Sequence, residues 1–141
     1  MKVLVAHDGS AHADKALQEA SRMVEKLNAE LVIMTSVPDI DLCLTEATDS
    51  ECKLVTESLF TEAVTSMKKV TDELAARGIK AGVVVKNGNP AEKIIDTVKE
   101  VGSELLVVGS HGRYGGIKRF FLGSVAAKVV EHAPCHVLVI K

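Results

Sequence analysis

Five short apolar runs along the chain predict five β-strands. They cover residues 3–6, 31–34, 83–85, 105–108 and 137–140. Each run is continuous rather than alternating, which is typical of strands that are covered on both faces, as in a parallel sheet. We therefore expect a buried parallel sheet at the centre of the fold.

Apolar residues at three- and four-residue steps between these runs predict four helices, over about residues 10–28, 52–77, 90–101 and 124–133. Ser10 or Asp8 can cap the first helix, and Gly78 follows the second as a stop. Pro90 suits the first turn of the third helix. The second helix is expected to bury an inner face made of Phe60, Ala63, Met67, Val70 and Leu74.

The alternation of strands and helices predicts an α/β fold with right-handed crossovers onto a parallel sheet. A length of 141 residues is typical of one domain, and we expect residues 1–141 to form a single one. Two connections, at residues 37–51 and 109–122, are longer than simple turns. Long loops in compact domains are often functional, so both are candidate functional segments.

Composition narrows the classes of function. Hydrophobic residues make up 47% of the chain and charged residues 26%, a balance that indicates a folded globular protein rather than a disordered one. The net charge of -2 and the aromatic content of 3% disfavour a general nucleic-acid binder, which needs a basic surface and stacking side chains.

No apolar run approaches the roughly 18 residues that cross a bilayer, and the first run is too short for a signal-peptide core. We therefore expect a cytoplasmic protein with no membrane partner. The three cysteines, Cys43, Cys52 and Cys135, form no CxxC pair and are interpreted as reduced thiols. A Cys43–Cys52 bridge is the alternative.

Ligands of open α/β sheets bind beyond the carboxyl ends of the strands, so the residues that follow each strand are candidates. Asp8 follows the first strand and could hydrogen-bond a ligand or act as a helix cap. Val37 follows the second strand and could form one apolar wall for a flat ring, although ordinary loop packing is the simpler interpretation. The Gly88-Asn89-Pro90 stretch after the third strand indicates turn and capping chemistry.

The segment after the fourth strand is the richest in candidate chemistry. Five glycines lie within the sixteen residues from Gly109 to Ser124, and Arg113, Lys118 and Arg119 add positive charge. Glycines let backbone N–H groups approach an anion closely, and a helix start favours phosphate. The segment therefore predicts a phosphate-binding loop, with a flexible surface loop as the alternative. His111 lies inside it and could orient the loop rather than catalyse.

Several other classes of site are excluded by their missing motifs. The chain has no G-x(4)-G-K-[ST] sequence, no G-x-G-x-x-G after the first strand and no G-x-S-x-G elbow. A phosphorylated receiver domain would need clustered acidic residues by the first strand and Asp at the end of the third, where Lys86 stands. The five histidines have no metal-ligand spacing, so we expect no metal site. We also expect no catalytic residues, because no general base or water-orienting carboxylate is evident near the glycine-rich segment.

The chain resembles the universal stress protein family over essentially its whole length. The resemblance rests on residues 5–10 (VAHDGS), 88–91 (GNPA), 109–112 (GSHG) with 123–124 (GS), and 133–140 (APCHVLVI). ATP-binding members of that family carry the pattern G-x(2)-G-x(9)-G-[ST]. This sequence has ten residues rather than nine between Gly112 and Gly123, and His136 stands where many members have proline.

The resemblance implies an ATP site built from particular residues of this chain. It implies Gly109 by the ribose, and Gly112, Gly123, Ser124 and Val125 at the phosphates. It also implies Asp8 and Val37 beside the adenine and ribose, with Ala6 and Val108 nearby. The members' sheet order is 3-2-1-4-5, so a single doubly wound, Rossmann-like five-stranded sheet with helices on both faces is expected.

Family members commonly dimerise through the last strand, and the run from Val137 to Ile140 would be an exposed apolar edge of the kind that is usually covered. Our hypothesis is an ATP-binding regulatory homodimer in which nucleotide occupancy orders residues 109–124. Mg²⁺ would accompany the phosphates through their own oxygens. No positioned general base is evident, so efficient hydrolysis is not expected. The alternatives are a nucleotide-free dimeric interaction module and a slow ATPase.

Overall fold

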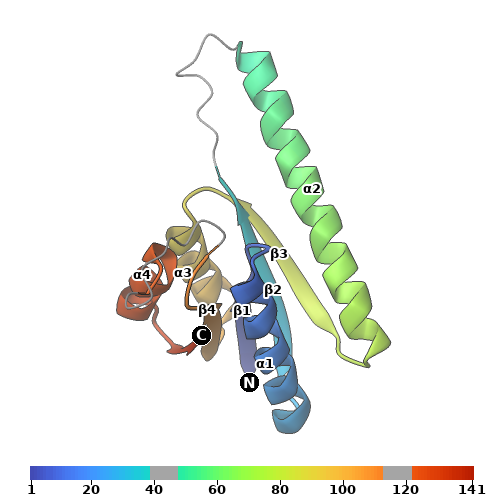
Figure 1. Ribbon diagram of the computed structural model, residues 1–141, viewed down its shortest axis with the longest axis vertical. Coiled ribbons are helices and arrows are strands. Elements are labelled where there is room, and N and C mark those ends of the chain that lie inside the picture. The colour runs from blue at the N-terminus through green and yellow to red at the C-terminus, as the bar shows by residue number, and fades with distance from the viewer. Residues whose placement is uncertain (39–47, 113–121) are drawn as a thin grey trace.

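The computed structural model describes residues 1–38, 48–112 and 122–141, which form a five-stranded parallel sheet flanked by helices (Figure 1). The strand order is β3-β2-β1-β4-β5. This confirms the predicted fold class and order. The elements in chain order are β1 (Lys2–Ala6), α1 (Ala11–Leu27), β2 (Glu30–Val37), α2 (Asp49–Ala76), β3 (Ala81–Asn87), α3 (Pro90–Val101), β4 (Leu105–Gly109), α4 (Ser124–His132) and β5 (His136–Ile140).

Local side-chain chemistry sets several helix ends. The Ser10 hydroxyl accepts a hydrogen bond from the Ala13 N–H at 3.1 Å, so Ser10, and not Asp8, caps α1. The α3 helix begins as predicted, with Asn89 as its cap and proline in its first turn. Gly78 follows the end of α2 with a φ of +81°, a conformation that glycine adopts without strain.

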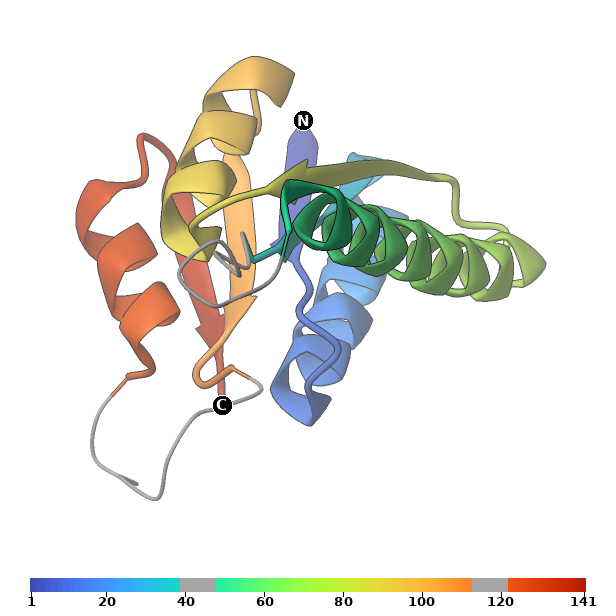
Figure 2. The same ribbon diagram turned by 90° about the horizontal axis from the view of Figure 1, so that it is seen from above.

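Two hydrophobic layers cover the two faces of the sheet. One layer joins α1 and α2 to the strands through side chains such as Ala16, Met67 and Val107. The other joins α3 and α4 to the opposite face through side chains such as Ile94 and Val129. Figure 2 shows these helix pairs on opposite sides of the strands. The sheet is therefore doubly wound, as expected.

The expectation that every strand is covered on both faces is wrong for β3. This strand lies at one edge of the sheet, and Val83 at its middle is 40% exposed. The apolar pattern of an edge strand can look like that of a central strand, so the pattern does not show where in the sheet the strand lies. Only the strand order reveals the exposure.

The α2 helix differs most from the prediction. It begins at Asp49 because Thr48 and Glu51 form a reciprocal capping box there, so the end of the predicted 37–51 loop is helical. Met67 and Leu74 are buried as predicted, but Phe60 is 37% exposed and is not part of the inner face. The beginning of α2 extends past the carboxyl ends of the strands (Figure 1).

In the described ranges, no helix is both long enough and apolar enough to cross a membrane.

Candidate functional site

The candidate site lies where the chain reverses its direction of winding. The neighbouring strands β1 and β4 pair in parallel, with Val5 beside Val107. From β1 the chain enters α1 on one face of the sheet, and from β4 it continues to α4 on the other. The two loops therefore separate at the carboxyl ends of adjacent strands, the position at which ligands of such sheets bind and which we call the crevice.

The loop after β1 presents Asp8 to this crevice. Asp8 is exposed, and its Oδ1 accepts a hydrogen bond from the Ser10 N–H at 2.9 Å, which closes a tight turn. A Cβ atom at Gly112 would lie 2.9 Å from Asp8 Oδ2, so the carboxylate faces the backbone of the loop after β4. The fold thus brings together two predicted site residues that are far apart in sequence.

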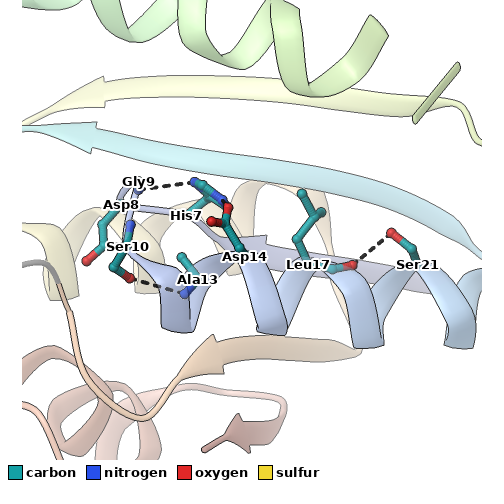
Figure 3. Close-up of polar contacts among 8 residues, drawn as sticks. All are labelled: His7, Asp8, Gly9, Ser10, Ala13, Asp14, Leu17 and Ser21. Carbon is teal, nitrogen blue, oxygen red and sulfur yellow. Dashed lines mark hydrogen bonds and ion pairs between the residues drawn. The ribbon is translucent and has the colours of Figure 1, made fainter. Parts of the chain in front are cut away.

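His7 lies beside this turn, between Gly9 and Asp14, as Figure 3 shows. The imidazole is buried; its Nδ1 accepts a hydrogen bond from the Gly9 N–H at 3.2 Å, and its Nε2 lies 2.9 Å from Asp14 Oδ1. Because Nδ1 accepts, the ring proton of the neutral imidazole is on Nε2 and is donated to Asp14. His7 therefore ties the Asp8 turn to the first turns of α1.

Gly109 allows β4 to end directly against α1. A Cβ atom at this position would lie 2.8 Å from His12 Cβ and 2.9 Å from the His12 carbonyl carbon. No real Cβ contact is that short, so the close approach requires glycine. The same packing sets the His12 ring beside that of His111, with ring centroids 5.4 Å apart.

Gly123 joins the start of α4 to the loop after β4. Its N–H donates to the Ser110 carbonyl oxygen at 2.7 Å, and a Cβ atom on it would lie 3.2 Å from His111 Cα. Ser110 also donates its N–H to the Ile140 carbonyl oxygen, and its hydroxyl lies 3.0 Å from His111 Nδ1. The Gly123 amide is therefore used inside the protein, and Gly123 contributes close approach rather than a donor.

The first turn of α4 is where donors for an anion remain. Its N-cap is Gly123, which has no side chain with which to cap the helix. Ser124 and Val125 stand in the first turn, where backbone N–H groups have no partner within the helix. These N–H groups and the positive end of the helix dipole suit a phosphate oxygen.

The other predicted site residues lie at or near the carboxyl ends of the strands. Ala6 ends β1 and is half-buried, whereas Val37 and Val108 are buried near the ends of β2 and β4. The Val37 carbonyl oxygen accepts a hydrogen bond from the Gly88 N–H at 2.9 Å, which joins β2 to the turn after β3. The carboxyl ends of β1, β2 and β4 thus supply small or apolar residues.

Part of the predicted loop chemistry lies outside the described residues. The cations Arg113, Lys118 and Arg119 fall in residues 113–121, and Cys43 falls in residues 39–47. Among the residues that the structure describes, no three His, Cys, Asp or Glu side chains are grouped so that they could hold a metal ion.

Sequence reasoning missed the roles of His7 and His12. A histidine at the end of an apolar strand run, with an acidic residue in the first turn of the next helix, was the only available sign of the His7–Asp14 pair. Nothing in the sequence relates His12 to Gly109, because that contact arises only when α1 packs against β4.

The sequence and the fold are both similar to those of proteins from a single family. The Universal stress protein family profile matches residues 1–141. The chain is 33% identical to Universal stress protein YxiE of Bacillus subtilis, over 99% of this chain and 98% of that protein. The solved structure of universal stress protein UspA from Lactobacillus plantarum superposes with a TM-score of 0.85 at 25% identity, covering 100% of this chain and 97% of the other.

Two more distant solved structures share the fold and hold nucleotides. One is a universal stress protein in complex with cAMP, with a TM-score of 0.66 and 24% identity, covering 100% of this chain and 97% of that one. The other is a family protein from Arabidopsis thaliana with AMP bound, with a TM-score of 0.69 and 20% identity, covering 100% and 91%.

Proposed function

The chain belongs to the universal stress protein family, and from that premise we propose that it is a regulatory protein that binds an adenine nucleotide, ATP in particular, at the crevice between the β1 and β4 loops. The observation that carries the proposal is the approach of Asp8 to the backbone at Gly112, beside the start of α4. The Asp8 carboxylate can accept hydrogen bonds from hydroxyl or amino groups. It lies next to backbone N–H groups that can bind phosphate.

Each part of the crevice has a role in this proposal. Asp8 accepts hydrogen bonds from the ribose or adenine, and Ala6, Val37 and Val108 form an apolar floor for the base. Gly109 lies by the ribose, and Gly112, Ser124 and Val125 approach the phosphates through their backbones. His111, held by Ser110, orients the loop.

The glycine geometry fits a nucleotide. Side chains at Gly109, Gly112 and Gly123 would each collide with, or crowd, a neighbour. Glycine at Gly112 and Gly123 therefore leaves the space between Asp8 and the start of α4 open to a ligand's sugar and phosphates. The cAMP- and AMP-bound relatives have this fold, which supports an adenine nucleotide as the ligand class.

The proposal gives the protein a binding role rather than a catalytic one. Mg²⁺ would reach the site with the nucleotide, held by phosphate oxygens, because the described residues offer no cluster of acidic ligands for it. Signalling would follow from nucleotide occupancy, which would order residues 109–124 for partner proteins. A second copy would pair along β5, an edge strand with half-buried valine, leucine and isoleucine side chains.

Titration calorimetry with ATP, AMP and cAMP tests the proposal, with Gly112→Ala as the site variant. The added methyl group would displace the Asp8 carboxylate, so we expect nucleotide affinity to fall about ten- to a hundredfold, the effect of losing one hydrogen bond to a charged group.

Gly82→Ala is the matched control, because a Cβ atom there meets only ordinary contacts at 3.8 and 4.0 Å. It should bind the nucleotide as the unmodified protein does. Absence of binding by the unmodified protein to all three nucleotides would refute the proposal and favour the nucleotide-free interaction module.

A further inference from the structure

The imidazole of His7 holds the backbone directly after Asp8. Its Nδ1 accepts a hydrogen bond from the Gly9 N–H at 3.2 Å (Figure 3), and this N–H belongs to the peptide bond that joins Asp8 to Gly9. Gly9 has a φ of +81°, a conformation that glycine adopts without strain. The next N–H along the chain, that of Ser10, donates to Asp8 Oδ1 at 2.9 Å. The position of the Asp8 carboxylate therefore depends on a turn that His7 holds.

The other nitrogen of the His7 ring faces a carboxylate. Nε2 lies 2.9 Å from Asp14 Oδ1, and His7 is only 5% exposed, whereas the Asp14 side chain is 71% exposed. A buried charge is costly unless it is paired. Because Asp14 already lies at hydrogen-bond distance, the ring can take up a proton without becoming an unpaired charge.

A proton on Nδ1 would turn this acceptor into a donor. Histidine is the side chain that ordinarily changes charge between pH 5 and 8, and both of its nitrogens are donors when it is charged. The Nδ1–H would then point at the Gly9 N–H, while the Nε2–H would keep its contact with Asp14. The contact that breaks on protonation is therefore the one that holds the Asp8 turn.

The strands on either side of His7 place uncharged residues next to it. On β2 the Met34 carbonyl oxygen accepts the His7 N–H at 2.8 Å, and Thr35 and Ser36 follow. On the other side β4 ends in Gly109 and is followed by Ser110. Helix α2 packs against β2 and β3. The titratable groups of these elements near this end of the sheet, besides Asp14, are Asp8, His12, Lys15 and His111, together with Cys52, which α2 buries.

We propose that His7 is a positioning residue of the nucleotide site, whose neutral imidazole holds Asp8 in place for the ligand and whose protonation releases it, so that nucleotide affinity falls in acid. The inference rests on the proposed nucleotide-binding function. His7 acts through the Asp8 turn. Loss of the hydrogen bond that holds this turn should weaken nucleotide binding about tenfold.

Titration calorimetry with ATP at about pH 8 and about pH 5 tests the proposal on the unmodified protein and on His7→Asn. Asparagine Oδ1 is bonded to Cγ, as histidine Nδ1 is, so it can accept the Gly9 N–H, and it does so at either pH. The quantity compared is the ratio of the two affinities at each pH, in which the titration of ATP, His12 and His111 cancels. Between the two pH values this ratio should shift about tenfold in favour of His7→Asn.

Two further variants separate the hydrogen bond from other effects of the substitution. His7→Phe has no acceptor at either pH and should bind ATP about tenfold more weakly than His7→Asn at both. His132→Asn is the matched control, because it makes the same substitution at an exposed histidine at the far end of α4. It should follow the unmodified protein at both pH values.

The outcomes distinguish this inference from the function on which it rests. A ratio that is the same at both pH values, with unchanged circular dichroism, would refute the role of His7 and leave the nucleotide site standing. Absence of ATP binding at both pH values would refute both proposals. In the unmodified protein without ligand, the NMR signal of the Gly9 amide should move together with those of the His7 ring as the pH falls. A Gly9 signal that does not follow the ring would refute the release of the turn.

Discussion

Replacing Gly109 with alanine tests whether the end of β4 depends on close approach to α1. The new Cβ atom would lie 2.8 Å from His12 Cβ, 2.9 Å from its carbonyl carbon and 3.0 Å from its carbonyl oxygen. Two of these three atoms belong to the backbone of α1, which cannot turn aside as a side-chain tip can. The helix and the strand must therefore move apart.

Insertion of one methyl group into a packed contact of this kind costs about 1–3 kcal/mol. For a chain of this size, 1 kcal/mol changes the melting temperature by roughly 3–4 °C, so we expect Gly109→Ala to melt about 3–12 °C lower. Calorimetry or thermal circular dichroism measures the change. Nucleotide affinity should fall as well, because the displaced strand end carries the loop that faces Asp8.

Gly82→Ala again serves as the control, since its Cβ atom would find only ordinary contacts on β3 and should leave the melting temperature within about 2 °C. Equal melting temperatures for Gly109→Ala and Gly82→Ala would show that α1 and β4 are not held at the distance described here. The glycine contacts on which the proposed nucleotide site depends would then be refuted.

Three further outcomes are expected. His7→Phe removes the acceptor of the Gly9 N–H and should lower the free energy of unfolding by about 1–3 kcal/mol in urea titrations, whereas Asp14→Asn, which keeps an acceptor oxygen, should change it less. Hydrogen bonds from Thr48 lower the pKa of Glu51, so the capping box is present at neutral pH and is lost as the pH falls through that lowered value; the protection of the first-turn amides of α2 against exchange, relative to their intrinsic rates, should fall in acid, and Thr48→Ala should show the low protection at every pH. Burial raises the pKa of the Cys135 thiol, so its alkylation, followed by peptide mass spectrometry, should reach half of its maximal rate at higher pH than that of a cysteine in a short peptide.

The strands and helices could be predicted from the sequence because each element has one dominant signal. A continuous apolar run such as that of β1 predicts a strand in an α/β chain. The Asn89 cap and the first-turn Pro90 begin α3 where expected. The strand order, however, came from the resemblance to a family, since the runs do not state which strand lies at an edge. Val83 therefore appeared to be a core residue and is a surface one.

The length of α2 relative to the sheet could not be predicted either. Phe60 has the helical spacing of a core residue but is exposed, and spacing alone cannot show how far α2 extends past the strands (Figure 1). Both errors concern the limits of the sheet, where local pattern and burial no longer correspond.

The proximity of the candidate site residues was predictable to the extent that a general rule places them. The carboxyl ends of adjacent parallel strands lie at the same edge of the sheet. The sequence therefore predicts that Asp8, Gly112 and Gly123 lie close together, as they do. The rule says nothing of what holds these residues there. The His7–Asp14 pair and the contact of His12 with Gly109 depend on side-chain packing between elements, for which the sequence contains no periodic signal.

The central position of β1 affects how the chain can fold during synthesis. β1 is made first, yet one of its two neighbours is β4, so Val3 waits for Leu105 before that side is hydrogen-bonded. Until then a nascent chain carries an apolar strand with one open side, a state that is slow to resolve and prone to association with other chains. Fragments that stop before residue 105 should therefore aggregate, whereas fragments that include β4 should be the first to remain in solution.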